Sequence, residues 1–246
     1  LTQIVTTTPG WDAVTNAQTA EVGQLAESQA AFETRRYQSV ALNGRSTTAS
    51  VYARVADLKN VIATYVTDNK TNVNKSIDGY TLKPHSIYVA VIGGDNSDIA
   101  KAIYNSVSAG CDYNGNTTVN VTDENTNAVE SVTFIRPSQL PLYVKLTIQD
   151  DGNLPDGYES IIKEAVYNNF YGLDTQTTIN GDAILRVVMN TDIYASRFIP
   201  SILNAGISQL LRVELSQNNS TWGDFIHVPI SAEPVLETGN IQIVTA

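Results

Sequence analysis

The sequence predicts an α+β fold: two tandem small α+β sandwich units with antiparallel or mixed sheets, preceded by an extended and helical N-terminal arm. Strand-like alternation and helical apolar stripes follow one another twice along the chain. Between the two runs, Pro137 and Pro141 each fix φ and remove a backbone donor, so neither a helix nor a central strand should cross there. We therefore expect an arm over residues 1–46, a first domain over 47–137 and a second over 138–246.

The arm combines a β-prone run with a polar helix. Residues 3–8 favour a strand that stops at Pro9-Gly10, and residues 28–36 are rich in good helix formers. The apolar stripe of this helix is thin, so we expect it to lie on another domain or subunit. Because the chain opens at Leu1 without a methionine, we expect it to be a piece of a longer protein.

The first unit is organised around a strand, a turn and a helix between residues 84 and 110. Residues 85–92 alternate as a strand, Gly93-Gly94 breaks it, and Ile99, Ala102 and Ile103 recur at helical spacing. Asn96, Ser97 or Asp98 is expected to cap the helix, and Gly110 to stop it. Around this block we expect a helix over 50–58 capped by Thr47 or Thr48, a strand over 61–66, an exposed polar connection over 67–81, and a hairpin of strands 117–121 and 131–135.

The second unit is predicted from a similar succession of patterns. Residues 142–148 alternate cleanly as a half-buried strand, and a helical stripe over 158–170 is closed by Gly172. A further helical stretch is expected over 182–195, extending or restarting around Pro200 up to residue 203. Three final antiparallel strands are predicted over 210–215, 224–230 and 241–244.

Composition excludes several classes of function. A net charge of −10 and a pI near 4.6 argue against a nucleic-acid or anionic-membrane partner, because both need clustered Lys and Arg. One cysteine rules out an internal disulfide, and with two histidines a Cys/His zinc site lacks ligands. No apolar run approaches the roughly 18 to 20 residues of a membrane-spanning helix.

A glycine turn that leads into a helix, as Gly93-Gly94 does, is also a common site for phosphate. The Gly93-Gly94 turn has neither the three glycines of the dinucleotide fingerprint nor the Gly-Lys-Ser/Thr ending of a P-loop. Asp95 and Asp98 also place negative charge where a phosphate would sit. A plain turn between strand and helix is the better interpretation.

Paired carboxylates are the residues that a hydrolase would use for acid–base work. Asp123-Glu124 and Asp150-Asp151 are adjacent pairs, but both lie in turn-forming sequence where carboxylates are solvated. Asp151-Gly152-Asn153 lacks the spaced ligands and terminal Glu of a calcium-binding EF-hand. A hydrolase is therefore the weakest hypothesis.

The remaining reactive side chains give no catalytic, cofactor or metal site. Cys111 is far in sequence from His85 and His227, so no spacing supports a nucleophile with its base. Each histidine is expected to be a half-buried strand residue. The tyrosines and Trp222 keep a second hypothesis open, a surface-exposed glycan-binding module, although Tyr88, Tyr104, Tyr143, Tyr158 and Tyr167 fall on predicted core faces.

A series of short motifs runs from Gly10 to the C-terminus. They are Gly10-Trp11-Asp12-Ala13-Val14-Thr15-Asn16 with Glu21-Val22-Gly23; Glu27-Ser28 with Phe32, Arg35 and Arg36; Ser50-Val51-Tyr52-Ala53-Arg54-Val55 before Val61; Pro84-His85-Ser86-Ile87-Tyr88-Val89 with Gly93-Gly94; Ile99-Ala100 and Ile103-Tyr104 with Ser108-Ala109-Gly110-Cys111; and Phe134, Arg136 and Pro137. In this order and spacing they resemble the baseplate J-like family, wedge components of contractile phage tails and related injection machines.

The resemblance implies a structural subunit without chemistry, repeated around a six-fold baseplate ring. Its implied partners are other baseplate proteins and further copies of itself, in a virion tail assembled in the host cytoplasm. The family usually has a further region ahead of the position of Gly10. This chain departs from the family pattern at Gln29, where Asp is usual, and at Asn60, where Gly is commoner. The change at Asn60 makes a tight turn there less expected than in the family.

Overall fold

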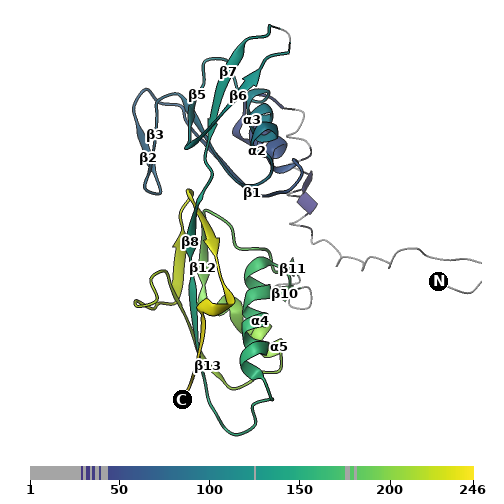
Figure 1. Cartoon of the computed structure of the whole chain (residues 1–246), viewed down its shortest axis with the longest axis vertical. Helices are drawn as coiled ribbons and strands as arrows, with labels where there is room; N and C mark the ends of the chain where they lie inside the picture. Colours follow the sequence, from purple (N-terminus) through teal and green to yellow (C-terminus); the bar gives the residue numbers. More distant parts are fainter. Residues whose placement is uncertain are drawn as a thin grey trace, which may run out of the picture.

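The computed structural model describes residues 44–124, 126–174, 178–179 and 182–246, together with Gln29, Phe32, Glu33, Arg35, Arg36 and Ser39. Two α+β units follow one another along the long axis of the molecule (Figure 1). Their small sheets include both parallel and antiparallel pairs, which confirms the predicted fold class. The strand predicted over residues 3–8 lies outside the described residues.

The first unit is a three-stranded sheet covered on one face by two helices. The sheet order is β1-β4-β5, with β1 antiparallel and β5 parallel to β4. Every second residue of β4, such as Val89 and Val91, packs against the helices and against a hairpin formed by β6 and β7. The elements are α2 (Thr48–Ala56), β1 (Val61–Asn69), β4 (Ser86–Gly93), α3 (Asn96–Tyr104), β5 (Asp112–Asn114), β6 (Thr117–Thr122) and β7 (Val129–Phe134).

The helix ends follow their capping chemistry. Thr47 caps α2 as predicted, and its side chain and that of Ser50 bond each other's backbone N–H groups. For α3 the predicted cap was wrong. Asp95 is the cap, because its carboxylate accepts from the N–H groups of Ser97 and Asp98. The helix also ends at Tyr104 rather than at Gly110.

The predicted polar connection over residues 67–81 was also wrong. Strand β1 continues to Asn69, and a hairpin of β2 (Lys75–Ile77) and β3 (Tyr80–Leu82) follows it. Asp78 and Gly79 form the hairpin turn with φ of 50° and 79°. Asp-Gly is a strong signal for this two-residue turn, and it outweighs the polar composition around it.

The second unit is built on β9, which lies between β13 and β16. β9 runs antiparallel to β13 but parallel to β16, so the prediction that the last strand is antiparallel was wrong. The cause is the pairing of the two preceding strands. β8 comes directly before β9 in the sequence, β15 comes before β16, and β8 and β15 pair in parallel, so β9 and β16 continue in the same direction. The elements are β8 (Ser138–Pro141), β9 (Tyr143–Ile148), α4 (Tyr158–Tyr171), α5 (Ile199–Asn204), β13 (Leu210–Ser216), β14 (Phe225–Val228), β15 (Ala232–Val235) and β16 (Ile241–Thr245), with short 3-10 turns at Ala195–Phe198 and Thr238–Asn240.

The helix predicted over residues 182–195 is absent from the described structure. Its sequence forms β11 (Asp182–Ala183), paired with β10 (Thr178–Ile179), then an extended segment and β12 (Thr191–Tyr194). The extended segment is fixed by a bond from the Val187 N–H to the Phe170 carbonyl, and Asn190 takes a left-handed φ of 56° that a helix excludes. The predicted restart at Pro200 is confirmed, since α5 has this proline in its first turn.

A third, smaller apolar cluster joins the two units. Tyr88 is fully buried in it, and its hydroxyl donates to the carbonyl of Ile230 over 3.1 Å. The cluster takes residues from both units and from the connection between them: Leu82, Tyr88, Ala90, Ile92, Ile135, Met189 and Ile230. Each unit also has a larger apolar cluster of its own. All buried residues of one cluster precede Arg136 in the sequence, and all buried residues of the other follow it. The domain boundaries predicted from the sequence remain a prediction. In the described part of the chain, no helix is long and apolar enough to cross a membrane.

Candidate functional site

The Gly93-Gly94 turn is closed by a side chain from the connection between the units. The Arg136 guanidinium donates to the carbonyls of Val91, Gly93 and Gly94, at 3.1, 2.5 and 2.8 Å. It also donates to the Asn96 side chain at 2.7 and 2.9 Å. With Asp95 occupying the helix N–H groups, the polar groups of this turn are satisfied by the protein itself, as expected for a structural turn.

The predicted carboxylate pairs lie in solvated turns. Asp150 and Asp151 each accept from a backbone N–H two residues ahead, at 3.0 Å in both cases. The backbone N–H of Asn153 holds the pKa of Asp151 below its ordinary value, whereas a general acid needs a raised pKa. Asp123 accepts from the Tyr104 hydroxyl at 2.9 Å, and that bond raises the pKa of Tyr104. These pairs are built as turns and surface contacts.

Cys111 and His85 both line one open hollow of about 310 Å³ beside the start of α2. Ser46, Thr47, Ser86 and Gly110 also line it. Burial raises the pKa of the Cys111 thiol, and the sulfur contacts the carbonyl of Asp112 at 3.5 Å. An activated nucleophile needs the opposite, a pKa lowered by a nearby positive charge or helix end. The hollow therefore brings two reactive residue types into one place without the chemistry that would activate the thiol.

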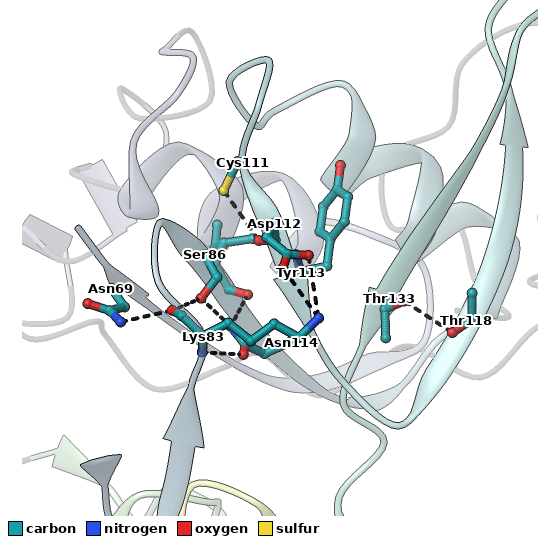
Figure 2. A network of polar contacts seen from close by, with 10 residues as sticks. Asn69, Lys83, Ser86, Cys111, Asp112, Tyr113, Asn114, Thr118 and Thr133 are labelled. Atoms are coloured by element: carbon teal, nitrogen blue, oxygen red, sulfur yellow. Dashed lines mark hydrogen bonds and ion pairs between the residues drawn. The ribbon is translucent and has the colours of Figure 1, made fainter. Parts of the chain in front are cut away.

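A polar network adjoins this hollow, since Asn69 and Ser86 belong to both. Figure 2 shows the network. The Asn114 amide donates to the Ser86 hydroxyl at 2.7 Å and to the Ile87 carbonyl at 2.9 Å. Its oxygen accepts from the N–H of Lys83 at 3.0 Å, and Asn69 donates to the Lys83 carbonyl at 2.8 Å. Each amide joins the end of one strand to the loop before β4, so the network fixes the sheet.

His227 occupies a polar contact between the units that the sequence did not predict. It lies on β14 as expected, but its side chain is 45% exposed rather than half-buried in a core. Its Nδ1 lies 2.7 Å from Asp192 Oδ1 on β12, and its Nε2 lies 2.9 Å from Asp78 Oδ1 in the β2–β3 turn. Asp78 and His227 are far apart in sequence, so spacing alone gave no signal for this contact.

The outer face of the β12–β14 pair carries an exposed aromatic pair. Tyr194 and Phe225 lie directly opposite in the register, 55% and 61% exposed, with ring centroids 6.2 Å apart. Asp192 and His227 are on the same face, because alternate strand residues point to the same side. Residues Ile193, Ile226 and Val228 point into the core. We call this surface the aromatic face. The sequence predicted β14, but it predicted a helix over residues 182–195 where β12 lies, so the pairing of β12 with β14 was not expected.

Trp222 is half-buried outside the described core clusters. The Lys145 ammonium lies 4.5 Å from its ring centroid, so the cation occupies one face of the indole. Lys145 is held there by Glu214 at 2.7 Å.

Within the described residues, no group of three His, Cys, Asp or Glu side chains is arranged to hold a metal ion.

No family model matches the chain, and no curated protein matches it.

Proposed function

We propose that this chain is a structural subunit of a contractile-tail baseplate wedge, which acts through protein–protein contacts and catalyses no reaction. The observation that carries the proposal is the aromatic face. Large apolar side chains exposed together mark interaction sites, and aromatic residues dominate the energetics of such interfaces. Tyr194 and Phe225 are held by strand register, so they form a preorganised contact rather than a mobile one.

The resemblance to the baseplate J-like family supports the same assignment, because several residues of its motifs stabilise the fold. Arg136 closes the Gly93-Gly94 turn, and these three residues belong to the motifs of the resemblance. Asn60, where the family favours Gly, has a left-handed φ of 63°, and its carbonyl accepts from the Gly94 N–H at 2.8 Å. Asn tolerates this conformation better than most residues, so the tight turn is kept.

The polar surroundings of the aromatic face suggest the chemistry of its partner. Asp192 flanks Tyr194, and Asp224 precedes Phe225. Within the chain, Asp224 already pairs with Arg212 and Asp192 with His227, so the apolar centre is the part of this surface that a partner with an apolar anchor would recognise. We assign this role to another baseplate protein or to a second copy of the chain.

Sedimentation velocity tests the proposal. The full chain is run at rising concentration, alone and with the products of neighbouring tail genes. We expect faster-sedimenting complexes that are weakened at least tenfold by Tyr194→Ser with Phe225→Ser. Val129→Ser is the matched control, because Val129 is a 62% exposed apolar residue of the other unit. A chain that stays monomeric in every mixture contradicts the proposal.

A glycan-binding module is the second candidate, since exposed aromatic rings also stack on sugars. Among the described residues we assign this role to the exposed rings of Tyr194 and Phe225, because Lys145 covers one face of Trp222. A glycan array on which the wild-type chain binds and the double variant does not would favour this alternative.

A further inference from the structure

The junction between the units has a polar contact in addition to its apolar cluster. The β2–β3 hairpin of the first unit points toward the second unit (Figure 1). Asp78, in the turn of this hairpin, contacts His227 on β14 and Ile230 just after it. Asp78 uses both of its carboxylate oxygens. One lies 2.9 Å from His227 Nε2, and the other accepts from the Ile230 N–H at 2.7 Å.

The geometry around His227 suits the doubly protonated ring. A carboxylate oxygen lies within 3 Å of each ring nitrogen, and a carboxylate can only accept. An imidazolium has two N–H donors and satisfies both contacts. A neutral ring has one donor, so its second nitrogen would present a lone pair to a carboxylate oxygen.

The charged groups on neighbouring elements have contacts of their own. On β13, Glu214 pairs with Lys145 and with Arg212, and Arg212 also reaches Asp224 ahead of β14. On β15, Glu233 pairs with Arg186. On the hairpin, Lys75 is exposed on β2. Asp192 and Asp78 are thus the charges that the ring of His227 meets at hydrogen-bond distance.

We propose that His227 is a proton-operated latch between the two units: the protonated ring holds the hairpin turn at Asp78 against the β12–β14 pair, and the neutral ring releases it. The bond from Ile230 to Asp78 and the apolar cluster remain in the released state, so the hairpin loosens while the units stay joined. The stiffness of the junction would then depend on pH, which goes beyond a passive structural role.

The direction of the pH effect follows from the bonds to the ring. The hydrogen bond to Asp192, followed by that to Asp78, raises the pKa of His227 against the opposing effect of its partial burial. A raised pKa means that the folded state binds the proton more tightly than the unfolded chain does. The latch is therefore complete below the ordinary histidine value of about 6.5 and is lost as pH rises through the raised pKa.

Hydrogen exchange of the full chain between about pH 5.5 and 8.5, corrected for the intrinsic exchange rate, tests the latch. We expect protection of residues 75–82 to fall at least about threefold across this range, while the β6–β7 hairpin keeps its protection. Equal protection of residues 75–82 at both ends of the range would overturn the proposal. The two histidines give a second measurement by NMR titration, and a His227 pKa at or below about 6.5 would also overturn it.

Four variants separate the latch from general effects of pH. His227→Gln removes the titration, so the hairpin should show the wild-type high-pH protection at every pH. His85→Gln changes the other, exposed histidine and should keep the wild-type profile. Asp192→Asn should lower the pKa of His227, while Asp78→Asn keeps a side chain suited to the left-handed turn and should abolish the pH dependence. A pH-dependent hairpin in His227→Gln contradicts the latch.

Discussion

The guanidinium of Arg136 lies 2.8 Å from the carbonyl oxygen of Gly94. This hydrogen bond joins the start of the connection between the units to the turn at the centre of the first unit. A turn of two left-handed glycines leaves carbonyls that neither β4 nor α3 can satisfy. The planar fork of an arginine reaches several of them at once. The turn is thereby fixed to the connection that leads into the second unit.

Arg136→Lys should destabilise the fold by about 2–3 kcal/mol, because a lysine keeps the charge but cannot reach three carbonyls together. Urea unfolding followed by circular dichroism measures the change. Arg45→Lys, at an exposed position, is the matched control and should lie within about 0.5 kcal/mol of the wild type. Equal stability of the two variants would show that the fork is not needed.

Gly93→Ala should cost more than Gly110→Ala, although both glycines have left-handed φ, of 76° and 81°. A methyl group at Gly93 would lie 2.3 Å from the Asn60 carbonyl, whereas at Gly110 it meets open space. Gly110→Ala isolates the backbone strain, about 1–2 kcal/mol, and the clash at Gly93 should add about 1–3 kcal/mol. Similar unfolding midpoints for the two variants would contradict this packing.

Asn169→Ala should destabilise the second unit by about 2–4 kcal/mol. Asn169 is fully buried, accepts from Arg197 Nε at 2.9 Å and donates to the Ser201 hydroxyl at 2.7 Å. Its loss leaves buried groups without their hydrogen bonds. Asn168→Ala, next along the same helix at a half-buried position, should cost less than about 1 kcal/mol. Thermal unfolding of both variants checks the difference.

Cys111 should react slowly with iodoacetamide. Burial raises the pKa of its thiol, so less thiolate is present at a given pH than in a free cysteine. The rate at pH 8 should be several-fold below that of a free cysteine and should recover in urea. A pH–rate midpoint at or below that of free cysteine would indicate an activated thiol and reopen the enzyme hypothesis.

Local patterns were enough for much of the fold. Alternation in residues 142–148 predicted β9, and the stripe ending at Gly172 predicted α4, because both signals act within one element. The failures involve partners distant in sequence. Residues 184–188 carry helical spacing but are held extended by α4, and β16 pairs parallel because β15 runs beside β8.

The contacts around His227 and on the aromatic face could not be predicted from the sequence, because they too join residues that are distant in the chain. Asp78 and His227 meet only because a hairpin of one unit reaches the other, and Tyr194 meets Phe225 only through strand register. The Asp-Gly pair at residues 78–79 was a usable signal for the hairpin. Nothing in local spacing indicated what its turn would touch.

Cross-linking mass spectrometry of purified tail particles from the producing organism tests the baseplate proposal most directly. We expect peptides of this chain in the particles, cross-linked to other baseplate proteins or to further copies, with cross-links near the aromatic face of Tyr194 and Phe225. Intact particles that lack this chain would contradict the account.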